Sequence, residues 1–358
     1  YGDDTSDPNV SLRKYAQATE NENEFKIKLN VKGNITHKPG VDMVFLLDNS
    51  GSMVNGPTGS RSRKKNTEDA LARIVRELKT NYPSNSDTGL RIGAHIFSDY
   101  SWNQGQETFP LSSNKSNWDG IVSGYKGFVV AGQTFTQRGL REAADVFIGA
   151  PNIGERQKFL FVLTDGAPNR SWNPEDGHAD GTMFLDPYYV TRFSMGTKGN
   201  YAGGNPLGAN KDRTKLPTMT RGVTSHITTT NSTAKAIKEN EGVQIHTIAV
   251  NVERFYSDDH PTETLKEGLY RMGSKKANRT SDTASDYFFY DVSNPDELEE
   301  TFKNWYDAII RTVDKGKITD PLGDMVDLVD GPRVTQVNNG ADPIATLDQP
   351  EATRTSDN

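Results

Sequence analysis

The chain has 358 residues, a formal net charge of −7 and no cysteine. This length allows one large domain and a smaller partner, and the lack of cysteine excludes disulfides, cysteine-bound zinc and a cysteine nucleophile. The acidic charge and scattered basic residues argue against a nucleic-acid partner, and no apolar run is long enough to insert into a membrane. The one basic cluster, Arg61 to Lys65, is interpreted as a solvated loop before a helix.

The first predicted strand lies in the N-terminal flank. Between Phe25 and Val31, apolar residues alternate with lysine and asparagine, which is typical of a half-buried strand. A second strand, Val41–Leu47, is apolar except for Asp42 and is followed directly by Asp48-Asn49-Ser50-Gly51-Ser52. A carboxylate and two hydroxyls on one tight loop could hold a hard cation such as Mg²⁺ or Ca²⁺, although ordinary turns have the same composition.

Further elements alternate along the chain in the manner of an α/β fold. A helix is predicted to begin at the cap Asn66, followed by a strand Gly89–Phe97 and a short edge strand Glu107–Leu111 that contains Pro110. The loop Gly132 to Thr136 precedes a predicted helix, Gln137–Ile148.

The next buried strand, Lys158–Thr164, ends at Asp165-Gly166. Because ligands of open α/β sheets bind beyond the carboxyl ends of the strands, oxygens from three loops could converge there. The residues that would supply them are Asp48, Ser50, Ser52, Thr134 and Asp165.

A long stretch after Asp165 lacks clear periodicity, but its aromatic residues argue against disorder. The remaining predicted elements are helices at Thr233–Asn240 and Thr262–Met272, strands at Val243–Val250 and Tyr287–Val292, a closing helix after Asn294-Pro295 that extends to Val313, and a strand-like segment Ile318–Val329. His95 and His246 lie within apolar strands, where core packing is the expected role.

The order Asp-x-Ser-x-Ser, Gly-x-Thr-x-Thr and Thr-Asp-Gly resembles the von Willebrand factor A family and its metal-ion-dependent adhesion site, over roughly Val41 to Val313. The resemblance implies that Asp48, Ser50, Ser52, Thr134 and Asp165 surround one divalent cation, with Mg²⁺ as the expected ion and Mn²⁺ or Ca²⁺ as alternatives. It further implies that the two aspartates act through water, which leaves one position open for a ligand oxygen.

These observations predict a doubly wound, mostly parallel α/β sheet with long inserted loops, and a small β module formed by both flanks. The expected boundaries are 1–38 for the N-terminal flank, 39–315 for the A domain with an insertion at about 167–230, and 316–358 for the C-terminal flank. This organisation resembles the tip adhesins of Gram-positive pili. It implies an extracellular, cell-wall-anchored or pilus-tip protein, of which this chain would be a processed form or a fragment without its sorting signal.

The expected function is non-enzymatic, metal-dependent adhesion to a host extracellular-matrix protein or cell-surface glycan, with a pilus backbone subunit as a further partner. Five aromatic side chains are candidates for ligand contact, namely Trp102, Trp118, Trp172, Tyr188 and Tyr189. Two alternatives stay open. A metal-dependent hydrolase would need a general base that the three loops do not obviously supply. An intracellular A-domain subunit of a chelatase or ATPase assembly would not need the flanking strands.

Overall fold

The computed structural model of the chain describes residues 10–33, 40–54, 62–81, 89–98, 107–151, 156–166, 168–175, 190, 193, 206–207, 215–220, 223–252, 262–277, 279, 281–292 and 300. The chain divides into two compact units, Tyr1–Thr312 and Val313–Asn358, and the second lies outside these ranges. The strand-like segment Ile318–Val329, the boundary near residue 315 and, apart from the helical residue Glu300, the predicted closing helix also lie outside them.

A six-stranded sheet forms the centre of the first unit, in the order β12-β11-β6-β3-β4-β5. Its strands are β3 (Gly40–Asp48), β4 (Leu90–Phe97), β5 (Glu107–Ser112), β6 (Arg156–Thr164), β11 (Val243–Val250) and β12 (Phe289–Val292). All neighbouring pairs are parallel except β4 and β5, which are antiparallel. The predicted α/β class with a mostly parallel sheet is therefore confirmed.

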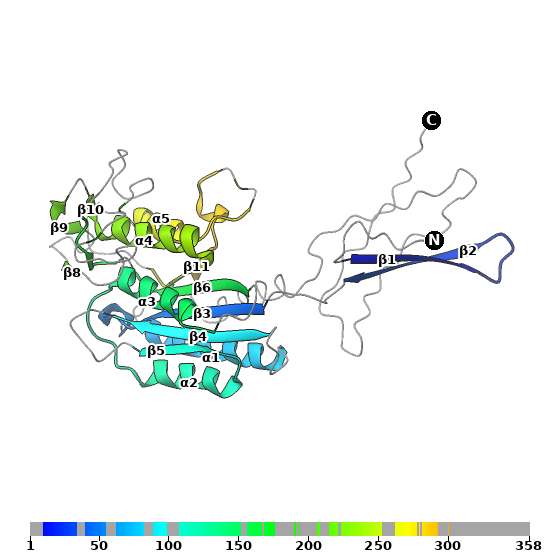
Figure 1. Cartoon of the computed structure of the whole chain (residues 1–358), viewed down its shortest axis with the longest axis horizontal. Coiled ribbons are helices and arrows are strands. Elements are labelled where there is room, and N and C mark those ends of the chain that lie inside the picture. The colour runs from blue at the N-terminus through cyan, green and yellow to red at the C-terminus, as the bar shows by residue number, and fades with distance from the viewer. Residues whose placement is uncertain are drawn as a thin grey trace. The chain divides into compact units, whose positions relative to one another are not determined.

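Helices cover both faces of this sheet (Figure 1). They are α1 (Arg63–Asn81), α2 (Lys115–Gly127), α3 (Thr136–Ile148), α4 (His226–Glu241) and α5 (Thr262–Met272). Alternate side chains of β3 pack against opposite layers of helices. Phe45 and Leu47 belong to the core cluster that includes α1 and α2. Val44 and Leu46 belong to the core cluster that includes α3, α4 and α5. This alternation follows from the two-residue period of a strand.

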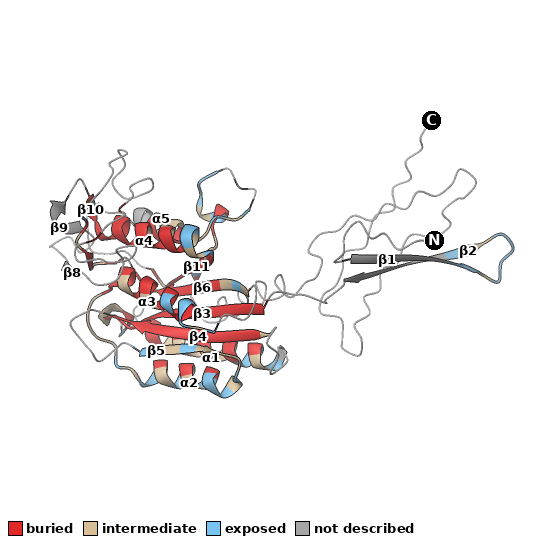
Figure 2. Cartoon of the chain, viewed as in Figure 1, coloured by how far each residue is buried: buried red, intermediate tan, exposed pale blue. Residues whose placement is uncertain are grey.

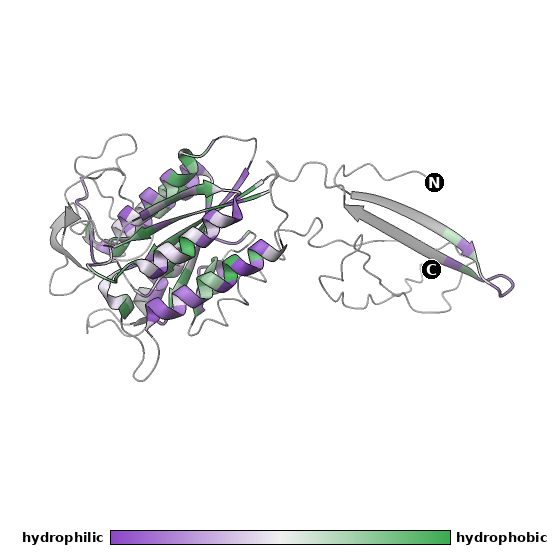
Figure 3. Cartoon of the chain, turned by 90° about the horizontal axis from the view of Figure 1, so that it is seen from below, coloured by the Kyte–Doolittle hydropathy of each residue, from purple (hydrophilic) through white to green (hydrophobic). Residues whose placement is uncertain are grey.

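The inner strands β3, β4, β6 and β11 are buried along most of their length, whereas the edge strands β5 and β12 are mostly intermediate or exposed. The helices alternate between buried and exposed residues (Figure 2). The colouring by hydropathy shows the matching pattern, with hydrophilic and hydrophobic residues interleaved along each helix (Figure 3). Each helix stabilises the fold because its apolar face packs against the sheet and is thereby removed from water.

Three helices differ from the sequence-based expectation. Helix α1 begins at Arg63 rather than after Asn66, and helix α2 lies in a stretch for which the sequence predicted no regular element. Helix α4 begins at His226, inside the range assigned to the insertion, with Ser225 as its cap. The glycines of α2 and the threonines in the first turn of α4 have low helix propensity, so tertiary packing decides these two helices.

Three two-stranded pairings lie outside the central sheet in the described residues. Strands β1 (Val10–Ala18) and β2 (Phe25–Gly33) form an antiparallel hairpin in the N-terminal flank. Within the predicted insertion, β7 (Ser171–Trp172) pairs with β8 (Pro206–Leu207), and β9 (Lys215–Thr220) pairs with β10 (Val223–Ser225). The joining of both flanks into one β module stays a prediction.

The two strand histidines are buried. The Nδ1 atom of His95 lies 2.8 Å from Thr108 Oγ1, and its Nε2 atom lies 2.8 Å from Glu142 Oε2. His246 packs against the rings of Phe161 and Phe288, with ring centroids 4.7 and 4.4 Å away. Burial, with a smaller effect of the charge on Lys276, lowers the pKa of His246 to about 3.

This depressed pKa predicts acid sensitivity. The unfolded chain binds a proton at His246 near pH 6.5 while the folded chain does not, so the free energy of unfolding should fall as pH drops from 6.5 towards 3, by at most about 1.4 kcal/mol per pH unit. We expect urea unfolding between pH 7 and 4 to show a shallower loss of stability for His246→Gln than for the parent chain. Equal slopes would contradict this assignment.

Candidate metal centre

Two parallel neighbours, β3 and β6, end side by side at one edge of the sheet. Leu47 pairs with Leu163 in their register, so Asp48 and Asp165 leave the sheet on adjacent loops. Both aspartates are fully buried. The parallel sheet thus places two carboxylates, 117 positions apart in the chain, at one site.

The loop after β3 is fixed by its own backbone. The amide of Ser50 donates to Asp48 Oδ1 at 2.8 Å, and the chain continues as a short 3₁₀ turn, Gly51–Val54. The amide of Gly51 donates to the carbonyl of Gly132 at 3.0 Å, and a Cβ atom on Gly51 would lie only 3.2 Å from that oxygen. Glycine at position 51 therefore permits the loops after β3 and before α3 to meet.

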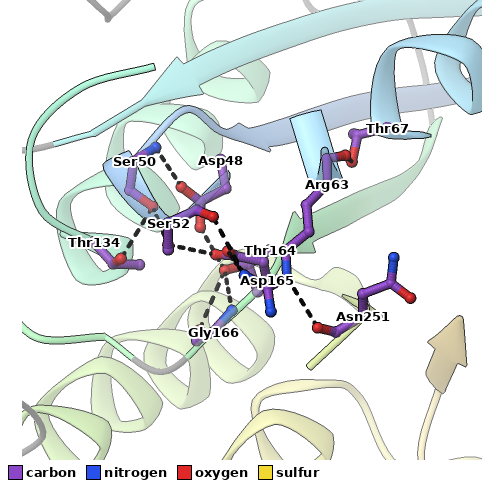
Figure 4. A network of polar contacts seen from close by, with 10 residues as sticks. All are labelled: Asp48, Ser50, Ser52, Arg63, Thr67, Thr134, Thr164, Asp165, Gly166 and Asn251. Carbon is purple, nitrogen blue, oxygen red and sulfur yellow. Dashed lines mark hydrogen bonds and ion pairs between the residues drawn. The ribbon is translucent and has the colours of Figure 1, made fainter. Parts of the chain in front are cut away.

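Hydroxyl groups connect the three loops in one chain of contacts (Figure 4). Thr134 Oγ1 donates to Ser50 Oγ at 3.1 Å, and Ser50 Oγ lies 3.2 Å from Ser52 Oγ. Ser52 Oγ then donates to Asp165 Oδ1 at 2.9 Å. The structure therefore brings together all five side chains that the sequence predicts as metal ligands. Ser50 and Thr134 are buried, whereas Ser52 is partly exposed, so solvent reaches the cluster on the Ser52 side.

Burial disfavours the charged forms of both carboxyl groups. Burial raises the pKa of Asp48, against hydrogen bonds from Ser50 and Thr164 that lower it. Burial and the neighbouring charge of Asp48 raise the pKa of Asp165 to about 7, with Arg63 acting in the opposite direction. A buried carboxylate pair of this kind costs free energy unless a positive charge joins it.

These residues fit a hard divalent cation. Carboxylate and hydroxyl oxygens are the donors that Mg²⁺, Mn²⁺ and Ca²⁺ prefer, and a dication would offset both buried charges. In the described part of the chain, no group of three or more histidine, aspartate, glutamate or cysteine side chains is placed to hold a metal ion. The hydroxyls of Ser50, Ser52 and Thr134, which contact one another and Asp165, are the further oxygen donors that a cation at this cluster would meet.

Several residues of the site were not expected to take part. Thr164 Oγ1 donates to Asp48 Oδ2 at 2.6 Å, and Asn169 Oδ1 accepts from the Thr134 amide at 2.9 Å. Tyr125, from helix α2, donates its hydroxyl to the Asp48 carbonyl at 2.7 Å. Thr164 directly precedes Asp165, which is a signal the sequence offered, but Tyr125 and Asn169 reach the site only through the tertiary fold.

The basic cluster before α1 also requires a correction. Arg63 and Lys64 are buried residues of α1 and not part of a solvated loop. Lys64 Nζ donates to Asn49 Oδ1 at 2.7 Å and lies 3.2 Å from the centroid of the Tyr125 ring. Burial lowers the pKa of Lys64 to about 7. Arg63 thus faces Asp165, with Nη1 3.4 Å from Oδ2, whereas the Lys64 ammonium is held by Asn49 and Tyr125.

Two of the five aromatic candidates for ligand contact are core residues. Trp118 is 1% exposed and donates from Nε1 to the Ser112 carbonyl at 2.7 Å. Trp172 is 3% exposed and packs against Phe135 and Phe193. The prediction that these two rings contact a ligand is therefore wrong, because their faces are occupied by the protein. Trp102, Tyr188 and Tyr189 lie outside the described residues.

Trp172 belongs to a third apolar cluster, which anchors part of the predicted insertion. The cluster joins residues of that stretch to α3 and α4 and consists of Phe135, Trp172, Val190, Phe193, Val223 and Ala236. Gln137 of α3 accepts from the Trp172 amide at 2.7 Å, and Ser232 of α4 accepts from the Val190 amide at 3.0 Å. These parts of the stretch are therefore integral to the domain.

Comparison with known proteins agrees with this architecture. Residues 42–202 match the family model of the von Willebrand factor type A domain. No curated protein sequence matches the chain. No helix in the described ranges has the length and apolarity to cross a membrane.

Solved structures with a similar fold include two forms of the pilus adhesin SpaC from Lactobacillus rhamnosus GG, with TM-scores of 0.62 and 0.59. Each is 23% identical and is matched over 87% of this chain and 35% of its own length, so this chain spans about a third of SpaC. The adhesive tip pilin GBS104 from Group B Streptococcus agalactiae has a TM-score of 0.51, 12% identity and coverage of 76% of this chain and 100% of its own. Residues 42–202 therefore match the von Willebrand factor type A family, and the described α/β sheet has a fold similar to those of these pilus proteins.

Proposed function

We propose that this chain is a non-enzymatic adhesion module of a surface or pilus-tip protein that binds its ligand through a divalent cation. The observation that carries the proposal is the convergence of two buried carboxylates and three hydroxyls at the end of the sheet. Asp48, Ser50, Ser52, Thr134 and Asp165 would hold the ion, with Mg²⁺ as the expected species. The similar fold of a pilus adhesin and a tip pilin supports a role in attachment.

A bound cation would supply an electrophilic centre for an oxygen of the ligand. The side chains of this protein would fix that centre: Asp48 through Ser50 and Thr164, and Asp165 through Ser52. None of the described hydrogen bonds of the five side chains involves a histidine or a glutamate. This arrangement favours binding over hydrolysis, because a hydrolase needs a general base beside the attacking water.

The partners that we propose are a host extracellular-matrix protein or a cell-surface glycan, together with a pilus backbone subunit. An array of matrix proteins and glycans, probed with the parent chain in Mg²⁺ and in EDTA, tests the proposal. Binding to at least one ligand should require Mg²⁺. Ligand binding that is equally strong in EDTA would refute cation dependence.

Ligand selectivity is expected to reside in residues 176–189 rather than in the ion. A cation accepts many oxygens, so discrimination needs shaped contacts from neighbouring groups. Residues 176–189 contain Tyr188 and Tyr189 and lie between the buried anchors Trp172 and Val190. Replacing 176–189 with a Gly-Ser linker, with both anchors kept, should preserve Mg²⁺ binding and abolish selective binding on the array. Unchanged selectivity in this variant would assign ligand choice to another segment.

A further inference from the structure

Arg63 connects three loops at the carboxyl edge of the sheet. Its Nη1 atom lies 3.4 Å from Asp165 Oδ2 and donates to the Ser52 carbonyl at 3.3 Å. Its Nε atom donates to the Asn251 carbonyl, beyond β11, at 3.0 Å. Figure 4 shows the side chain extending from α1 towards Asp165, with Asn251 on its other side. The guanidinium therefore has a defined place beside the cluster.

The contact with Asn251 fixes that place. Asn251 has a φ of 48°, a left-handed conformation that is uncommon for a residue other than glycine. Its amide donates to the Val292 carbonyl at 2.9 Å, which holds the peptide in register with β12. Asn251 is thus tied to the sheet through its amide, and its carbonyl accepts from Arg63.

The charge of Arg63 acts on the same carboxylate that the proposed cation would use. The side chains of Arg63 and Asp165 are 9% and 0% exposed, so water screens their attraction only weakly. A dication beside Asp165 would be attracted by the two aspartates and repelled by the nearby guanidinium. Arg63 therefore stabilises the cluster without a cation and opposes the entry of one.

We infer that Arg63 is a built-in counter-charge of the cation site, which holds Asp165 in place when no cation is bound and reduces the affinity of the site for divalent cations. This inference rests on the proposed function, because it requires the five oxygen donors to bind a cation. It identifies Arg63 as a positioning residue whose charge competes with that of an entering cation for Asp165. A weaker intrinsic affinity would keep occupancy responsive to the cation concentration outside the cell.

The same helix offers a matched control. Lys65 lies two positions after Arg63, and its Nζ atom pairs with Asp69 at 2.9 Å and with Glu68 at 3.3 Å. Its side chain is 40% exposed. Lys65→Gln thus removes one positive charge from the same turn of α1 without touching a contact of Asp165.

The test measures Mn²⁺ affinity and thermal unfolding in EDTA for the full chain, Arg63→Gln, Arg63→Met and Lys65→Gln. Removing the guanidinium should tighten Mn²⁺ binding about tenfold and lower the melting temperature in EDTA. The rise in melting temperature on adding Mn²⁺ should therefore be larger in the Arg63 variants than in the parent chain. Lys65→Gln should match the parent chain in both measurements.

Unchanged or weaker Mn²⁺ binding in both neutral Arg63 variants would overturn the inference, and so would their failure to fold even with Mn²⁺. An Arg63 variant that folds only with Mn²⁺ would support it. Failure of the parent chain itself to bind Mn²⁺ would instead refute the proposed cation site, so the two failures are distinguishable.

Discussion

Replacing Asp48 with asparagine is expected to abolish divalent-cation binding and leave the fold intact. The amide keeps the volume of the carboxylate, and its oxygen can still accept from the Ser50 amide, a contact of 2.8 Å in the parent chain. The substitution removes a fully buried negative charge whose pKa burial raises, so stability without cation should not fall. Mutating residues that only hydrogen-bond to metal ligands lowers metal affinity by about 10–100-fold. The loss of one of the two carboxylates of the site should therefore lower cation affinity by more than about 100-fold.

The measurement is Mn²⁺ or Mg²⁺ titration by calorimetry, with melting temperatures recorded with the cation and with EDTA. Asp48→Asn should show no shift between the two conditions, and Ser50→Ala should also lose the cation-induced shift. Asp119→Asn is the control, because Asp119 lies on α2 with its side chain 59% exposed and pairs with Lys79. A parent-like shift in both Asp48→Asn and Ser50→Ala would show that the cation binds elsewhere.

Replacing Trp172 with alanine is expected to lower the free energy of unfolding by about 3–5 kcal/mol. The ring is 3% exposed, and its centroid lies 5.5 Å from that of Phe135 and 6.4 Å from that of Phe193. The loss combines the transfer free energy of the indole with the cavity that it leaves between α3 and the segment after β6. A large effect would show that this segment is part of the domain core.

Urea unfolding of Trp172→Ala and of Ile148→Ala provides the comparison. Ile148 closes α3 with its side chain 62% exposed, so its truncation should cost no more than about 0.5 kcal/mol. Equal stabilities for the parent chain and Trp172→Ala would mean that the segment contributes little to folding. Because Trp172 is expected to stabilise the domain, the Gly-Ser replacement of 176–189 retains it. Removing the whole 167–230 stretch would delete Trp172, three further members of the third cluster and the start of α4.

The residues of the candidate site could be predicted because each stands at a recognisable end of a regular element. The apolar runs before Asp48 and Asp165 are long enough to specify strands, and parallel strands bring their carboxyl ends to one edge. The strand Val243–Val250 and the helix Thr262–Met272 have the expected bounds for the same reason, since their apolar spacing is regular. The prediction of the sheet thus implied the prediction of the site.

Local pattern was insufficient for helix α2 and for the first turn of α4. Helix α2 contains Gly120 and Gly124, and the start of α4 is rich in threonine, so neither sequence has a strong intrinsic preference for a helix. Their helical state is stabilised by packing, which residues far away in the sequence provide. The same reasoning applies to Trp118, whose burial depends on the strand and helices around it.

The sequence by itself determined the α/β class, the strands that end at the site and the five oxygen-bearing side chains. Only the tertiary structure decided which charges and rings surround them. Arg63 and Lys64 have the composition of a solvated loop, yet both are buried, because the two buried carboxylates attract positive charge at the edge of the sheet. Trp172 lies in a polar stretch and was predicted to contact a ligand, yet its ring packs in the core cluster with residues of α3 and α4. The role of a side chain at such a site depends on the charges and apolar surfaces that meet it across the fold, and these come from distant parts of the chain.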